Sequence, residues 1–78
     1  MKVVSLLIVV GLTLQLLALN INTATLKELQ TLSGIGPKVA FKIVEYRKQH
    51  PFIKKSDLLK VKGIGKLKFK KLESTIEI

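Results

Sequence analysis

The sequence contains no cysteine and no tryptophan, and only 5 of its 78 residues are acidic. Without cysteine, the chain can form no disulfide and carries no thiol nucleophile and no cysteine-based zinc site. The carboxylates are dispersed along the chain, whereas metal-dependent nuclease chemistry needs carboxylates gathered around an ion. The single histidine, His50, directly precedes Pro51 and is interpreted as a helix-end residue. We therefore expect no enzyme, no metal site and no cofactor.

Lysine and arginine give the chain a strongly positive charge. There are 14 of these residues, and the formal net charge is +9. All of them except Lys2 follow Leu19, as do all 5 acidic residues, so the part beyond Leu19 keeps a net charge of +8. The length allows one domain and at most one appendage. A small domain with such a field favours nucleic acid or an anionic membrane surface as its partner.

A nearly uninterrupted apolar stretch follows Lys2 and runs from Val3 to Leu19. It shows no polar face, so it does not fit a helix of a soluble core. A basic residue before an apolar run is the order found in secretory signal peptides, and an uncleaved membrane anchor is the alternative. Cleavage is favoured because an anchor would leave no spacer between membrane and domain. We predict an apolar leader helix over residues 1–19, a folded domain over residues 20–78, and an exported protein.

One tripeptide occurs twice: Gly34-Ile35-Gly36 and, 29 positions later, Gly63-Ile64-Gly65. Two glycines around an isoleucine predict a tight turn, with the isoleucine side chain pinned to the core. A helical pattern begins after each turn, and the first amides of a helix have no intrahelical partner. Those amides and the helix dipole attract anions such as phosphate. Two such turns on a small basic chain predict that it binds nucleic acid.

The remaining patterns predict four main helices and an all-α fold. Thr25 and Glu28 form a capping box for a first helix that runs to about Leu32. Pro37 opens the second and longest helix, which extends to about Gln49. Ser56 is the expected N-cap of a short third helix over 57–60, and the fourth covers about 66–74. A β-branched tail over 75–78 is expected to pack back on the domain.

The aromatic residues fall mostly at apolar positions of the sequence. Tyr46 and Phe52 are expected in the core, and Phe41 and Phe69 also fall mostly at apolar positions. No aromatic array suited to stacking single-stranded bases is visible in this pattern.

The segments Leu32–Ala40 and Val61–Phe69 each fit the helix-hairpin-helix pattern, except that bulky Phe69 stands where the first copy has Ala40. Beyond these, Asn20–Thr25, Tyr46-Arg47, Pro51-Phe52 and Asp57–Leu59 extend the match. Together they resemble the DNA-binding domain of the ComEA competence proteins over residues 20–78. The resemblance implies a tandem, SAM-domain-like helix-hairpin-helix domain that binds double-stranded DNA without sequence preference. It also implies an exported DNA receptor in natural transformation, in a periplasm or on the outer face of the cytoplasmic membrane, with components of the DNA-uptake channel as further partners.

The expected DNA contacts come from the two turns and the lysines beside them. Backbone amides and lysine side chains would bind phosphates, and the membrane would be contacted only through the N-terminal segment if it stays uncleaved. The candidate residues are Gly34, Ile35, Gly36, Lys38, Gly63, Ile64, Gly65, Lys66, Lys68 and Lys70.

Two other functions remain open at this point. One is an intracellular helix-hairpin-helix accessory protein of DNA repair or recombination. The other is a cationic domain that binds anionic lipid, since the charge alone does not separate lipid from DNA.

Overall fold

The structure is a computed structural model that describes residues 18–78. The predicted leader over residues 1–19 lies outside the described residues, apart from Ala18 and Leu19. The elements in chain order are β1 (Leu19–Asn20), α2 (Leu26–Leu29), α3 (Pro37–Gln49), the 3-10 helix η1 (Lys55–Lys60), α4 (Lys66–Leu72), the 3-10 turn η2 (Glu73–Thr75) and β2 (Ile76–Glu77). Within residues 18–78, none of the helices combines the length and the apolar character needed to cross a bilayer.

The first two helices form from the predicted local signals. The Thr25 hydroxyl accepts the Glu28 amide at 3.0 Å, and the Glu28 carboxylate accepts the Thr25 amide at 2.9 Å, which is a complete capping box. The α-helical part of α2 is shorter than expected, because two bonds between residues three apart continue it to Leu32 in a tighter form. Helix α3 begins at Pro37 and ends at Gln49, as predicted.

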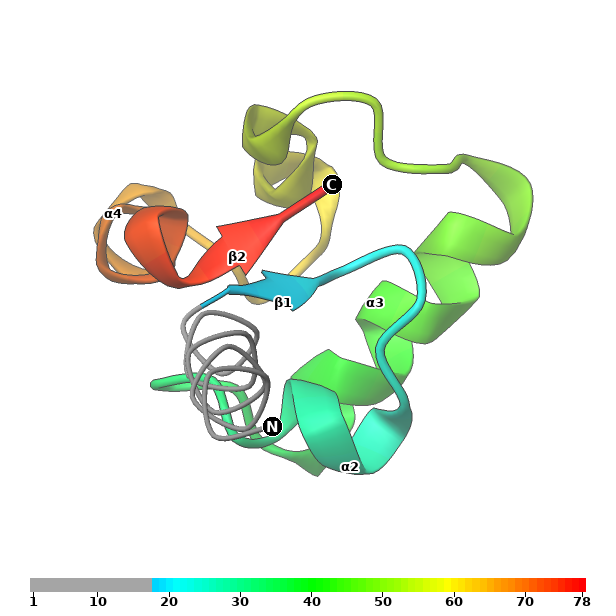
Figure 1. Cartoon of the computed structure of the whole chain (residues 1–78), viewed down its shortest axis with the longest axis horizontal. Helices are drawn as coiled ribbons and strands as arrows, with labels where there is room; N and C mark the ends of the chain where they lie inside the picture. The colour runs from blue at the N-terminus through cyan, green and yellow to red at the C-terminus, as the bar shows by residue number, and fades with distance from the viewer. Residues whose placement is uncertain (1–17) are drawn as a thin grey trace, which may run out of the picture.

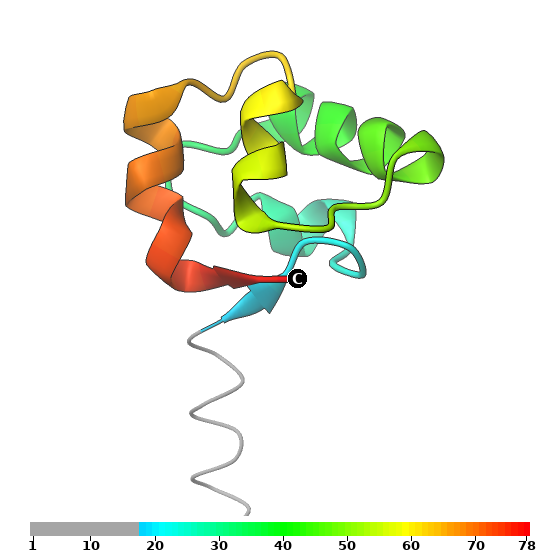
Figure 2. The same ribbon diagram turned by 90° about the horizontal axis from the view of Figure 1, so that it is seen from above.

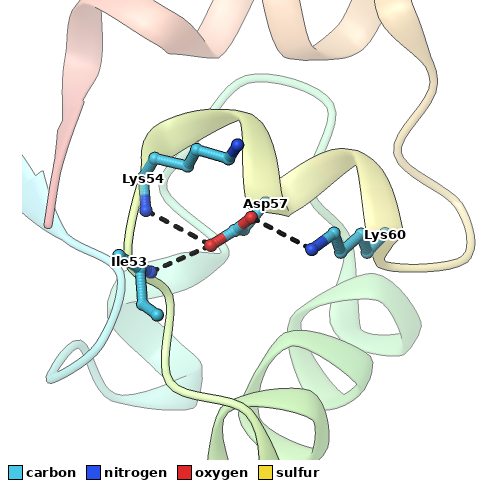
Figure 3. Close-up of polar contacts among 4 residues, drawn as sticks. All are labelled: Ile53, Lys54, Asp57 and Lys60. Atoms are coloured by element: carbon cyan, nitrogen blue, oxygen red, sulfur yellow. Dashed lines mark hydrogen bonds and ion pairs between the residues drawn. The ribbon is translucent and has the colours of Figure 1, made fainter.

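The third helix differs from its prediction in type, start and cap. It is a 3-10 helix that begins at Lys55, and the capping group is Asp57 rather than Ser56. The Asp57 carboxylate accepts the amides of Ile53 at 3.0 Å and Lys54 at 3.2 Å, and it pairs with Lys60 Nζ at 3.3 Å (Figure 3). Asp57 is also a buried residue. The two amide bonds, helped by Lys60, hold the pKa of this carboxyl below its ordinary value, although burial opposes them.

We expect Asp57→Asn to destabilise the domain at neutral pH, because the amide cannot reproduce two charge-assisted bonds. The folded-state pKa is lowered, so the stability that Asp57 contributes is present above the unfolded pKa of about 3.9 and is lost as pH falls through the folded value. The gap between the variant and the natural protein in urea denaturation should therefore shrink in acid. Glu45→Gln is the control, since its ion pair with Lys48 is exposed and should contribute little. A gap of the same size in acid would contradict this account.

The structure also contains a short parallel strand pair, which the all-α prediction did not include. In β1 and β2, Leu19 pairs with Ile76 and Asn20 pairs with Glu77 (Figure 1). The Ile21 amide extends the ladder to the Glu77 carbonyl at 3.1 Å. Ile21 and Ile76 are both fully buried beside it. The predicted tail thus packs back as expected, but it does so as a strand, and the folded unit already includes Leu19.

The two halves of the chain share one core. Each half is a helix pair joined by a hairpin loop, and Figure 2 shows this for η1 and α4. Four apolar pairs that correspond across the 29-residue repeat are buried: Leu29 and Leu58, Leu32 and Val61, Ile35 and Ile64, and Ile43 and Leu72. Neither half alone could cover its apolar face, so the repeat produces a single hydrophobic core.

The Asn22 side chain links the N-terminal segment after β1 to the second half of the chain. Its side-chain nitrogen donates to the Phe52 carbonyl at 2.9 Å, and its side-chain oxygen accepts the Phe52 amide at 2.8 Å. Arg47 adds a bond to the Ile21 carbonyl at 2.9 Å. These contacts satisfy backbone groups that would otherwise lose their water on folding.

Candidate nucleic-acid interface

The two hairpin turns have the same backbone structure. The Ile35 amide donates to the Leu32 carbonyl at 3.1 Å, and the Ile64 amide donates to the Val61 carbonyl at 3.1 Å. The first glycine of each tripeptide has a positive φ, 78° at Gly34 and 104° at Gly63. Residues with a Cβ rarely adopt this conformation, so the turn needs glycine at both positions.

Ile35 and Ile64 hold the turns against the core, as predicted, although both were also among the candidate DNA contacts. Both side chains are buried in the core, and both amides are used inside the turn. Neither group is free to meet a ligand. These two residues fix the position of the turns, and the contact surface is provided by their neighbours.

The second glycine of each tripeptide is the N-cap of a helix. Gly36 precedes α3 and Gly65 precedes α4, both in an extended conformation that other residues also adopt. No side chain caps either helix. A Cβ at either glycine would meet no atom within 4 Å. Glycine here leaves the surface above the helix start open, which lets another molecule approach the backbone closely.

Free amides surround both turns. In the part of the chain that the structure describes, the amides of Gly34, Gly36 and Lys38 donate to no backbone or side-chain oxygen, and those of Gly63, Gly65 and Lys66 behave alike. Unpaired amides at a helix start carry the positive end of the helix dipole. Each turn therefore offers donors to an anion.

The two hairpins open onto the same hollow, whose volume is about 480 Å³. Its lining comes from Ser33 and Gly34 of the first hairpin, from Gly65 of the second, and from Lys66, Leu67, Lys68 and Lys71 of α4. Of the residues with free amides, Gly34, Gly65 and Lys66 line this hollow, whereas Gly36, Lys38 and Gly63 do not.

Packing across the repeat holds this arrangement in place. The Lys68 side chain lies against Gly34, 3.4 Å from where a Cβ would stand. In the same way, Val39 lies 3.1 Å from the Cβ position of Gly63. Positions 39 and 68 correspond in the repeat, so each hairpin packs against the start of the other half's second helix. Such reciprocal contacts are those of a two-fold related pair.

The predicted lysines divide between this hollow and the surface around it. Lys66 and Lys68 line the hollow, whereas Lys38 and Lys70 are exposed outside it. Lys71 also lines it and was missed, although its spacing of three residues from Lys68 places both on one helix face. Among the described residues, the ion pairs are Lys48 with Glu45 and Lys60 with Asp57, so the lysines of the hollow carry unpaired charge.

The arrangement suits the binding of phosphate groups. Amides and ammonium groups position a nucleic-acid backbone and read no base directly. Within residues 18–78, no group of three His, Cys, Asp or Glu side chains is placed to hold a metal ion.

Two kinds of comparison with known proteins point to the same family. The family model described as "Helix-hairpin-helix motif" matches residues 17–77. The chain is 48% identical over 60 residues to ComE operon protein 1 of Bacillus subtilis, which covers 76% of this chain and 29% of that protein. It is 53% identical over 55 residues to an uncharacterized protein of Haemophilus influenzae, with 68% of this chain and 49% of that protein covered.

A third similarity is to a much longer protein. The chain is 48% identical over 59 residues to human endonuclease/exonuclease/phosphatase family domain-containing protein 1, which covers 74% of this chain but 10% of that protein. The chain thus spans less than half the length of each of these relatives. The chain belongs to the helix-hairpin-helix family, and its hairpin domain is of the ComEA type.

Proposed function

We propose that this protein binds double-stranded DNA through the phosphate backbone, without preference for base sequence. The observation that carries the proposal is the shared hollow, which is lined by Gly34 of the first hairpin, by Gly65 of the second, and by three lysines of α4. Amide and ammonium donors suit phosphate oxygens. Because neither kind of contact reads a base edge, affinity should depend on salt and not on sequence.

Placement outside the cytoplasmic membrane, as a DNA receptor in natural transformation, is the second part of the proposal. It is supported by the similarity to ComE operon protein 1 and by the apolar stretch after Lys2. Components of an uptake channel would then be further partners, and the membrane would be met only through the N-terminal segment. A reporter fused after Ile78 tests the location, since it should be active only beyond the membrane.

The alternative is an intracellular accessory protein of DNA repair or recombination. The observation in its favour is the similarity to a protein whose name includes an endonuclease/exonuclease/phosphatase domain. The chain covers 10% of that protein, and the described residues hold no candidate metal cluster, so we propose a binder and not a nuclease. A reporter active only inside the cell would favour this alternative.

A duplex titration of the full chain at several salt concentrations tests the DNA-binding proposal. With roughly five phosphates neutralised, the logarithm of the affinity should fall with the logarithm of salt at a slope of about −4 to −5. Scrambling the duplex sequence should leave the affinity unchanged. Anionic vesicles should not displace the duplex, and a preference for vesicles would instead support lipid as the ligand.

A further inference from the structure

A second hollow lies on another part of the surface and shares no lining residue with the first. Its volume is about 390 Å³, within the range of small-ligand sites. One wall comes from α3 and carries Phe41, Tyr46 and His50. The other wall is the segment from the end of η1 to the second hairpin, where Lys62 directly precedes Gly63. We refer to this hollow as the aromatic groove.

The aromatic side chains of the groove are more available than their sequence positions suggested. Phe41 is 55% exposed, although it was assigned to a mostly apolar position. Tyr46 is half-buried, with its ring stacked on Phe52 at a centroid distance of 5.1 Å and tilted against His50 at 5.2 Å. Tyr46 is therefore held in place, while Phe41 presents a free ring surface.

Positive charge surrounds these rings. Lys42, Lys60 and Lys62 line the groove. The one carboxylate among the lining residues is Glu45, and it pairs with Lys48 at 2.9 Å. Lys60 contacts Asp57 beneath it, but 64% of its side chain stays exposed. The groove thus combines flat apolar rings with ammonium groups, which suits a ligand that is both aromatic and anionic.

We propose that the aromatic groove binds an unpaired nucleotide of a single-stranded nucleic acid. The base stacks on Phe41 against the wall formed by Tyr46, and the flanking phosphates meet Lys42 and Lys62. An acidic peptide would satisfy the lysines but has no planar ring for Phe41. A base inside a duplex is already stacked on its neighbours, so the groove takes an unpaired base. Because Lys62 adjoins the second hairpin, a strand leaving a duplex on the hairpins has a short path to the groove.

Binding of the full chain to a labelled oligothymidylate of about 12 nucleotides tests this site. Phe41→Ala should weaken binding by at least about fivefold, which is the lower end of the effect of removing one ring on which a base stacks. Phe41→Trp should keep the affinity, and its indole fluorescence should be quenched when a base stacks on it. Ile53→Ala is the control: Ile53 is apolar, 85% exposed and outside the groove, so binding should change by less than about twofold.

The same variants separate the groove from duplex binding at the hairpins. Phe41→Ala should leave duplex affinity unchanged, and glutamate at Gly36 and Gly65 should leave the effect of Phe41→Ala on the single strand in place. The proposal is overturned if Phe41→Ala binds the oligothymidylate as well as the natural protein does. It is equally overturned if polyglutamate of matched charge displaces the oligothymidylate as readily as unlabelled oligothymidylate does.

Discussion

Replacing Gly36 and Gly65 together with glutamate is expected to lower the affinity for duplex DNA by about 100-fold, from about tenfold at each site. Each new side chain would stand directly above a helix start and place a carboxylate where a phosphate is expected to bind. The fold should survive, because both glycines have extended backbones and open space beside them. Fluorescence anisotropy with a labelled duplex measures the affinity, and circular dichroism checks the fold.

The matched control for this variant removes the same amount of charge elsewhere. Lys27→Gln combined with Lys48→Gln also lowers the net charge by two, at exposed residues outside both hollows. We expect a loss of only a few-fold, from weaker counterion release. Equal losses in the two double variants would indicate binding by diffuse charge and would rule out docking on the hairpins.

Phe52→Ala is expected to have the largest effect on stability, about 3–5 kcal/mol. The ring is 2% exposed and stacked on Tyr46, and its backbone is bonded twice to Asn22, so the surroundings can collapse little around the cavity. For a domain of this size the melting temperature should fall by about 12 °C or more. Thermal and urea denaturation of the full chain provide the measurement.

Phe41→Ala is the natural comparison for this stability experiment. It removes the same ring from a side chain that is 55% exposed, so the expected cost is below about 1 kcal/mol. Similar melting temperatures for the two variants would contradict the burial that the structure assigns to Phe52.

The parts of the fold that were predictable rest on local chemistry. Gly34 and Gly63 need a conformation that glycine adopts readily, Pro37 suits the first turn of a helix, and Thr25 with Glu28 forms a cap within four residues. Signals of this kind act over a few positions, so the sequence carries them in readable form. The repeat adds a second copy, and this is why the buried pairs could be matched across the two halves.

The parts that were missed depend on contacts between residues far apart in the sequence, or on a choice between neighbouring residues that suit the same role. The strand pair is two residues long and joins positions near the two ends of the described chain, and the bonds from Asn22 to Phe52 span 30 positions. Ser56 and Asp57 are both good capping residues, and only the backbone path shows that Asp57 reaches the free amides. Phe41 has an apolar side chain, but within residues 18–78 it stays 55% exposed on α3.

The candidate site was predictable in its backbone and less so in its side chains. The helix-hairpin-helix pattern located both turns, because the turn backbone requires glycine at fixed positions. Which lysines meet in the hollow depends on how α4 crosses the first hairpin, and this placed Lys71 inside it and Lys38 and Lys70 outside. The isoleucines marked the turns correctly, but their burial shows that a residue inside a binding motif can act by shaping it.

The pairing of β1 with β2 also sets an order of events in the cell. Because Leu19 and Asn20 find their partners only at Ile76 and Glu77, a chain still leaving the ribosome cannot complete the domain until those late residues have emerged. Until then the Ile21 amide lacks its acceptor, the Glu77 carbonyl, so the strand pair is among the last parts of the domain to form.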